Sequence, residues 1–351
     1  MQRIEIGERS IGAGEPCWVV AEISANHNQS FDRAVEILRA AKKAGADAVK
    51  LQTYTADTLT LDFDRECFRI GGDSLWAGKT LYELYREAYT PWEWHAPLMA
   101  VAREERLECF STPFDATAVD LLEGLNVRVH KIASFELVDI PLLRKVAGTG
   151  KPVIMSTGMA SLAEIEEAVT TLREHDAGPL ALLKCTSAYP ASPSDMNLRT
   201  IPHLAETFDV VAGLSDHTLG SSVAIAAVTL GACIVEKHFT LRRADGGPDS
   251  AFSMEPDEFA KMVREIRATE SALGHVTYTP TADEARNIRF RRSLFVSQDV
   301  QKGDVFTERN IRSVRPAQGL HPRFLDTVLG KRAACAIEPG TPLAWRHVER
   351  G

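Results

Sequence analysis

The 351-residue chain has no hydrophobic run of membrane-spanning length and no excess of positive charge. A membrane helix needs roughly 20 consecutive apolar residues, and no stretch approaches that length. Residues 1–5 contain no apolar signal segment. A net charge of -8 argues against nucleic-acid binding. We therefore expect a cytoplasmic protein that binds neither a membrane nor nucleic acid.

The chain also lacks cysteines at the paired spacing of a metal site. Its six cysteines lie mostly in apolar runs, which is typical of buried thiols in a reducing compartment. With 44% hydrophobic and 25% charged residues, the composition is ordinary for a globular enzyme.

Eight short apolar runs alternate with amphipathic helical stretches between about Cys17 and Leu273. This alternation predicts an α/β fold, namely a (β/α)8 TIM barrel rather than an open sheet. Ser30 is expected to cap the helix that follows it, and Ser161 with Glu164 forms a capping box. The expected strands cover residues 17–23, 48–51, 108–110, 127–132, 153–155, 180–183, 210–214 and 233–235.

The pattern changes near residue 279, where a basic connector leads into short strands with glycine turns. These features predict a barrel at residues 1–280, a linker at 281–291 and a small β-rich domain at 292–351. A domain of about 60 residues is near the lower limit for independent folding, so we expect it to dock on something. A strand–turn–strand pattern occurs twice in it at identical offsets, as Val300, Gly303, Phe306 and Ile311 and then as Ile337, Gly340, Leu343 and Val348.

Two histidines, His217 and His238, end neighbouring strands of the expected barrel. Parallel strands deliver their C-terminal ends to one rim, where the active sites of this fold lie. Two imidazoles there can share a divalent metal ion. Imidazole alone favours zinc, whereas a site completed by water and substrate oxygens suits manganese or magnesium. Alternatively, each histidine only forms hydrogen bonds within the rim, and the adjacent Asp216 and Glu236 either support the ligands or point elsewhere.

Lysines, serines and carboxylates recur at the same level. Lys50, Lys131 and Lys184 end alternate strands, and ammonium groups directed into the mouth suit an anionic substrate. Lys131 or Lys184 could instead form a Schiff base. Any one of the three lysines could also simply extend its ammonium group into water. Glu22 and Glu136 are candidate acids, bases or water-orienting groups, or ion-pair partners of the lysines. The strand-end hydroxyls, suited to a phosphate or to turns, belong to Ser111, Ser134, Ser156, Ser187 and Ser215.

Taken together, seven strand-end motifs resemble those of the sialic acid synthase family, in order along nearly the whole chain. The C-terminal repeat resembles the antifreeze-like (SAF) domain of that family. The motifs cover residues 21–28, 50–53, 111–114, 131–134, 156–159, 213–218 and 236–240.

The resemblance implies condensation of phosphoenolpyruvate with an open-chain acetamido sugar, which gives a nine-carbon 2-keto acid and phosphate. It implies that His217 and His238 hold a divalent cation (Mn²⁺ or Mg²⁺, alternatively Co²⁺) that polarises the sugar aldehyde. Glu22 would orient the attacking water. The implied phosphoenolpyruvate ligands are Lys50, Lys131, Ser134, Ser156, Ser187 and Ser215. The implied sugar contacts are Gln52, Glu136, Tyr189 and Asp249, with Arg315 of the partner subunit in a domain-swapped homodimer.

Within the family, residues 53–61, 81–95 and 319–322 most resemble the branch that makes pseudaminic acid from 2,4-diacetamido-2,4,6-trideoxy-L-altrose. The N-acetylneuraminate branch usually has asparagine where this chain has Ser187. A deoxy, diacetamido sugar needs an apolar pocket. An aromatic cluster in the long segment 63–94 could supply it, although its helical spacing favours core packing. Its members are Tyr82, Tyr85, Tyr89, Trp92 and Trp94.

Three alternatives stay open. A sister enzyme of the legionaminate or neuraminate branch would use a different amino sugar. A Schiff-base aldolase would use Lys131 or Lys184 as its nucleophile. A carbohydrate- or ice-binding protein would depend on the C-terminal domain and would leave the strand-end lysines and histidines without a role.

Overall fold

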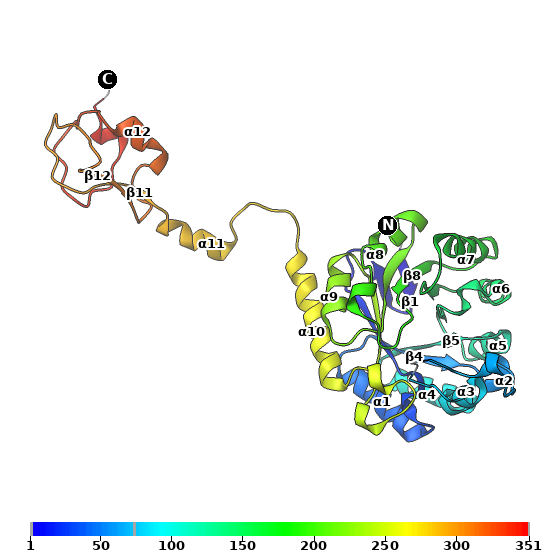
Figure 1. The fold of residues 1–351 in the computed structure, drawn as a ribbon. Helices are drawn as coiled ribbons and strands as arrows, with labels where there is room; N and C mark the ends of the chain where they lie inside the picture. Colours follow the sequence, from blue (N-terminus) through cyan, green and yellow to red (C-terminus); the bar gives the residue numbers. More distant parts are fainter. Residues whose placement is uncertain (1–2, 73–74, 350–351) are drawn as a thin grey trace. The chain divides into compact units, whose positions relative to one another are not determined.

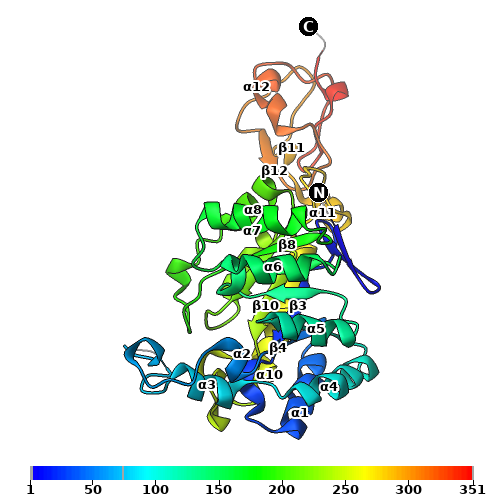
Figure 2. The same cartoon turned by 90° about the vertical axis from the view of Figure 1, so that its right-hand side faces the viewer.

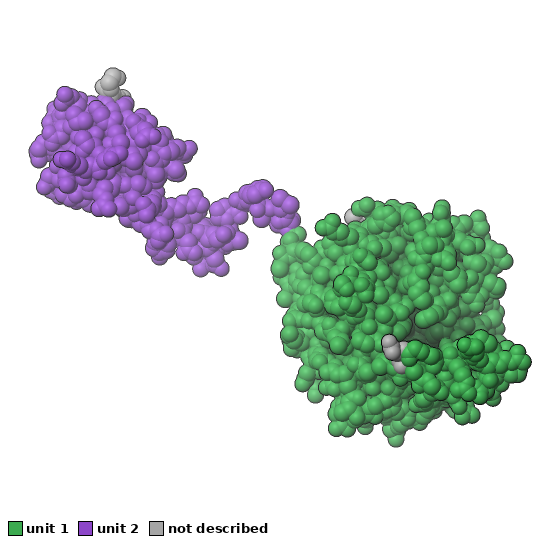
Figure 3. All heavy atoms as spheres, viewed as in Figure 1, with its two compact units in different colours: residues 1–274 green, residues 275–351 purple. Residues whose placement is uncertain are grey.

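The computed structural model describes residues 3–72 and 75–349. The chain forms two compact units, residues 1–274 and residues 275–351, which Figure 3 shows in different colours. The predicted linker at residues 281–291 contains a short helix, α11 (Ala282–Asn287).

Unit 1 is a closed barrel of eight parallel strands, which confirms the predicted fold class (Figure 1). The strands follow one another around the barrel in chain order, and the last strand, β10, closes it by pairing with both β9 and β3. They are β3 (Trp18–Glu22), β4 (Ala48–Thr53), β5 (Glu108–Pro113), β6 (His130–Ile132), β7 (Val153–Ser156), β8 (Leu180–Cys185), β9 (Val211–Asp216) and β10 (Ile234–His238).

Helices surround the outside of these strands (Figures 1 and 2). The predicted caps are confirmed: the Ser30 hydroxyl accepts from the Arg33 amide at 3.3 Å, and Ser161 with Glu164 caps α7 reciprocally. The helices of unit 1 are α1 (Phe31–Lys43), α2 (Ala56–Leu59), α3 (Leu81–Ala88), α4 (Trp92–Glu104), α5 (Ala116–Gly124), α6 (Ile140–Ala147), α7 (Leu162–Glu174), α8 (Thr200–Phe208), α9 (Ser222–Thr229) and α10 (Pro256–Leu273). Among the described residues, no helix is long and apolar enough to cross a membrane.

A hairpin closes the N-terminal end of the barrel. Its strands, β1 (Arg3–Ile6) and β2 (Arg9–Gly12), place Ile4 and Ile11 in one buried cluster with Trp18 and Phe110 from the barrel strands. The Trp18 and Phe110 rings stack with centroids 5.4 Å apart. Apolar side chains therefore fill the barrel interior at this end, and the buried charged side chains of the interior lie toward the opposite end, where the strands terminate.

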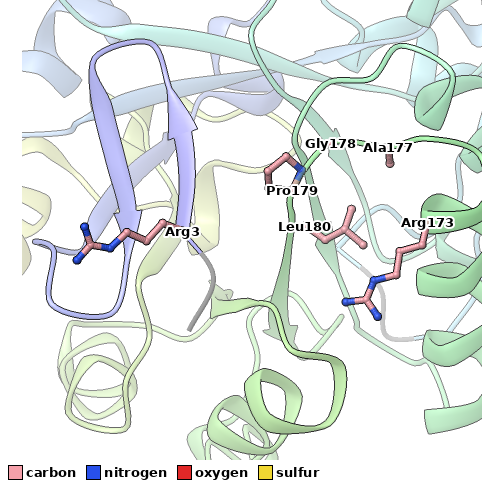
Figure 4. A pocket seen from close by; sticks show the side chains of 6 residues that line it. All are labelled: Arg3, Arg173, Ala177, Gly178, Pro179 and Leu180. Atoms are coloured by element: carbon pink, nitrogen blue, oxygen red, sulfur yellow. The ribbon is translucent and has the colours of Figure 1, made fainter.

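A surface cavity of about 440 Å³ lies beside the start of β8 (Figure 4). The side chains of Arg3 and Arg173 lie on opposite sides of it, and residues 177–180 form the remaining wall. Since β8 begins here, the cavity is at the opposite end of the barrel from the strand-end residues.

Unit 2 holds the internal repeat, and its two copies pair with each other. Val300 and Ile337 exchange both backbone hydrogen bonds, at 3.1 and 2.8 Å. The two glycines of the repeat, Gly303 and Gly340, both have positive φ, 88° and 83°. The apolar members of both copies share one buried cluster. Besides α11, the unit contains β11 (Ser293–Val296), β12 (Ile311–Val314) and α12 (Leu325–Val328).

Candidate active site

Four charged side chains lie at the inner C-terminal end of the barrel, and each is at most 6% exposed. Lys50 Nζ forms an ion pair with the Glu22 carboxylate and lies 3.5 Å from Glu236 Oε1. Lys131 Nζ lies 3.9 Å from the same Glu236 oxygen, to which Ser215 Oγ donates at 3.3 Å. Two cations are therefore balanced by two carboxylates, which is how buried charges are normally accommodated.

Burial sets the protonation of this cluster. It raises the pKa of Glu22 to about 7, although the Lys50 ammonium opposes the shift. Burial also lowers the pKa of Lys131, against the opposing charge of Glu236. A carboxyl group with a pKa near neutrality is suited to accept and return a proton at physiological pH.

The two strand-end histidines lie side by side, with ring centroids 5.4 Å apart. His217 Nδ1 is 3.0 Å from the Thr186 carbonyl oxygen, which leaves its Nε2 free to act as a ligand. His238 Nδ1 is buried without a hydrogen-bond partner, and burial lowers the pKa of His238 well below its usual range. A metal cation binds an imidazole that is neutral and has a ring nitrogen available for coordination.

These residues fit an open cation site. Across the described ranges, no group of three or more histidine, cysteine, aspartate or glutamate side chains is arranged to hold a metal ion. Two histidines alone do not make a closed structural site, so water and substrate would have to complete the coordination.

A glycine and two serines form a small cradle beside the lysines. The Gly158 amide donates to Ser134 Oγ at 3.0 Å. A Cβ atom on Gly158 would lie 2.2 Å from Ser187 Oγ and 2.7 Å from Ser134 Oγ, so only glycine leaves room for both hydroxyls. Lys131 Nζ donates to Ser156 Oγ at 2.6 Å. An amide, three hydroxyls and an ammonium group suit a phosphate or carboxylate.

The side chains implied to contact the sugar join the same network. Gln52 Nε2 donates to Glu22 Oε1 at 3.2 Å and to Ser24 Oγ at 3.3 Å, and Ser24 Oγ donates to Asp249. Ser24 is buried with a φ of 51°, a left-handed conformation that is uncommon outside glycine. Hydrogen bonds therefore run continuously from Asp249 to Glu22.

Two other implied sugar contacts differ in their surroundings. Glu136 Oε2 is buried without a hydrogen-bond partner, and burial raises the pKa of this carboxyl to about 7. Arg315 belongs to unit 2, where its side chain is exposed.

The expectation that all three strand-end lysines face the mouth is wrong for Lys184. Successive side chains of a strand alternate between its two faces, and Leu183 belongs to the barrel interior. Lys184 therefore lies on the outer face, where Nζ donates to the Cys185 carbonyl at 2.7 Å. The same alternation turns Asp216 outward, where it pairs with Lys237 at 2.6 Å.

Sequence reasoning left Cys185 and Ser24 without a role, and it considered Glu236 only as a support for the histidines, not as a partner of the lysines. Glu236 precedes His238 by two positions, so the period of a strand already places both on one face. Cys185 Sγ lies 3.9 Å from His217 Nδ1. Burial raises the pKa of this thiol, but the hydrogen bond and charge of His217 outweigh that effect and bring the pKa to about 7. The unusual φ of Ser24 leaves no signal in the sequence.

The side chains of the aromatic cluster of segment 82–94 are all half-buried, and they contact other residues of unit 1. The Trp94 ring contacts the Phe31 ring at 5.7 Å, and Tyr82 Oη donates to Asp57 at 3.1 Å. Different aromatic rings lie against the histidines. Tyr189 is 4.3 Å from His217, and Phe252 is 4.8 Å from His238, between ring centroids.

Two family models match this chain, one over the barrel and one over unit 2. The NeuB family model matches residues 37–278, and the SAF domain model matches residues 291–349. The chain belongs to the NeuB family.

Three comparisons show which proteins of known sequence or structure the chain is similar to. The chain is 47% identical to a pseudaminic acid synthase of Helicobacter pylori, over 96% of this chain and 99% of that protein. It is 36% identical to the N,N'-diacetyllegionaminic acid synthase of Legionella pneumophila, over 98% of each chain. A crystal structure of N-acetylneuraminic acid synthetase from Leptospira borgpetersenii superposes with a TM-score of 0.72 and 32% identity, over 82% of this chain and 95% of that chain.

Proposed function

We propose that the protein condenses phosphoenolpyruvate with 2,4-diacetamido-2,4,6-trideoxy-L-altrose to give pseudaminic acid and phosphate. The observation that carries this proposal is the 47% identity, over nearly both full lengths, to a pseudaminic acid synthase. The site is chemically suited to the reaction, because it places an anion cradle next to two adjacent histidines.

The reaction joins two carbons and breaks one C–O bond. The methylene carbon of phosphoenolpyruvate attacks the sugar aldehyde, and the aldehyde oxygen becomes a hydroxyl. Positive charge develops on the carbon bearing the phosphate, and water adds there as Glu22 accepts its proton. The resulting tetrahedral centre expels phosphate and becomes the 2-keto group. Lys50, Lys131 and the serine hydroxyls of the cradle hold the phosphate and carboxylate throughout.

A divalent cation held by His217 and His238 would supply Lewis-acid polarisation of the aldehyde. The two rings are held by their neighbours, since the Thr186 carbonyl oxygen lies 3.0 Å from His217 Nδ1 and Phe252 packs on the His238 ring. We propose Mn²⁺ or Mg²⁺, with Co²⁺ as a further candidate, because substrate and water oxygens would complete the coordination.

The metal assignment predicts that His238→Ala abolishes metal-dependent turnover while the fold persists. The expected loss in kcat is about 10³-fold or more, since charge stabilisation at the aldehyde is removed. Activity of the wild type should disappear on chelation and return with added Mn²⁺. Wild-type turnover by the variant after chelation would refute the assignment.

Arg315 is proposed to reach the sugar from the partner subunit of a domain-swapped homodimer. Its guanidinium would bind an acetamido carbonyl. This arrangement gives the small second unit a functional reason to remain attached to the barrel.

The decisive experiment offers the enzyme a panel of amino sugars with phosphoenolpyruvate, measures phosphate release and identifies the product by mass spectrometry. Pseudaminic acid should form from the diacetamido altrose. Turnover of N-acetylmannosamine alone, or of the legionaminate precursor alone, would move the protein to a sister activity. Borohydride should trap no adduct on Lys131, because the reaction needs no Schiff base, whereas a trapped adduct would favour the aldolase alternative.

A further inference from the structure

A continuous line of aromatic rings leads from outside the barrel to the two histidines. The Trp76 and Tyr189 ring centroids are 5.9 Å apart, and Tyr189 contacts both His217 at 4.3 Å and Phe252 at 5.1 Å. Trp76 comes from the long segment between α2 and α3, far from Tyr189 in the sequence. It was not part of the predicted aromatic cluster.

Two sets of hydrogen bonds hold Trp76 in this place. Its indole Nε1 donates to the Pro248 carbonyl at 2.8 Å, one residue before Asp249. The segment carrying it is closed at its base by pairing of Arg69 with Thr80 and by a 2.9 Å bond from the Ile70 amide to the Lys79 carbonyl. The Trp76 side chain is half-buried.

The chemistry of the surrounding site indicates which part of the substrates would contact the Trp76 ring. The lysine and serine side is charged and suits phosphoenolpyruvate, and the histidines suit the aldehyde end of the sugar. The Trp76–Tyr189–Phe252 side is apolar, which suits the part of the sugar that carries methyl groups instead of hydroxyls.

Resting on the proposed function, we propose that Trp76 is a specificity-determining residue that packs against the deoxy, methyl-bearing part of the sugar. An apolar wall rejects a substrate with one added hydroxyl by up to about 10²-fold, because the hydroxyl loses its hydrogen bonds to water on binding. Trp76 therefore favours a 6-deoxy sugar over its 6-hydroxy counterpart.

The test compares kcat/KM for the 6-deoxy diacetamido sugar with that for its 6-hydroxy counterpart in the full-length enzyme. Trp76→Ala should lower kcat/KM for the deoxy sugar by roughly tenfold or more, while the value for the hydroxy sugar changes by less than about threefold. The KM for phosphoenolpyruvate should stay within about twofold. Trp76→Phe keeps an aromatic face but loses the hydrogen bond to the Pro248 carbonyl. Its selectivity for the deoxy sugar should therefore fall between that of the wild type and that of Trp76→Ala.

Trp94→Phe is the matched control, because the Trp94 ring packs against the Phe31 ring of α1. In the part of the chain that the structure describes, Trp94 forms no ring pair with Tyr189 or Phe252. Its selectivity should equal that of the wild type. An unchanged selectivity ratio in a folded Trp76→Ala enzyme would overturn the inference. A wild type that fails to use the diacetamido sugar would instead overturn the proposed function, so the two failures are distinguishable.

Discussion

At the residue scale, the ammonium groups of the anion site already have carboxyl partners before substrate arrives. Lys50 and Lys131 are already paired with Glu22 and Glu236. Phosphoenolpyruvate brings up to three negative charges, so it must compete with these carboxylates for the ammonium groups. The raised pKa of Glu22 eases this competition, because a protonated Glu22 releases Lys50.

Gly158 provides a direct test of the cradle. Gly158→Ala places a methyl group against Ser134 and Ser187, and overpacking of this kind costs about 1–3 kcal/mol, or roughly 5- to 150-fold in the KM for phosphoenolpyruvate. Steady-state kinetics measures the change. Gly124→Ala is the control, since its added Cβ meets no atom within 4 Å. Equal KM values in the two variants would contradict a role for the cradle.

The pKa of Glu22 predicts how the rate depends on pH. Below about pH 7 the carboxyl is protonated and cannot accept a proton from water, so kcat/KM should rise with pH and level off above about 7. Glu22→Gln should remove this limb and lower kcat by about 10²- to 10⁴-fold.

Burial raises the pKa of Glu136 to a similar value, so its contribution to the pH profile has to be tested separately from that of Glu22. Glu136→Gln should keep the ascending limb and raise the KM for the sugar. A limb that disappears in Glu136→Gln but persists in Glu22→Gln would reverse the two roles.

Much of this site could be predicted at the residue level, and the limits have physical causes. His217 and His238 were found because strand ends of a barrel converge. Lys184 was assigned to the wrong face of its strand, because a position at a strand end predicts only the rim that a residue is near. The face is predicted only by the two-residue period of the strand. Trp76 could not be found, because its place depends on how a long irregular segment folds back onto Tyr189.

At the scale of elements, strands and helices followed from simple patterns. The eight apolar runs became the eight barrel strands, with several ends extended by one to three residues beyond the apolar run. The ends of β4 and β8 illustrate this, since Gln52 and Cys185 are paired with the neighbouring strands although they follow the apolar run. The hairpin β1–β2 was not predicted, because four-residue strands carry too little periodicity.

That hairpin should contribute stability rather than activity. Ile11 is fully buried at the N-terminal end of the barrel, and Ile11→Ala should lower the free energy of unfolding by about 2–5 kcal/mol. Denaturant unfolding measures it, and kcat of the folded enzyme should not change, because the active face is at the other end. Leu230→Ala, at a more exposed position, should cost within about 0.5 kcal/mol. A smaller loss for Ile11 than for Leu230 would argue against this role.

At the scale of the whole molecule, the proposed exchange of Arg315 between subunits predicts complementation. Arg315→Ala should raise the KM for the sugar more than the KM for phosphoenolpyruvate, and His238→Ala should be inactive. After subunit exchange, an equal mixture should recover about one quarter of wild-type activity, because half the dimers then hold one intact site. A stable mixed dimer without recovered activity would exclude the swapped arrangement.

The paired repeat of unit 2 bears on how such a domain arose and how it would behave if divided. Each half supplies the backbone partners that the other half needs: the Gly303 amide donates to Ala333 and the Gly340 amide donates to Val296, both at 2.8 Å. A polypeptide carrying a single half would leave these backbone groups without hydrogen-bond partners. Two copies of it could supply the partners to each other, so they should associate and rebuild the unit. The present domain thus has the symmetry of a dimer fused into one polypeptide.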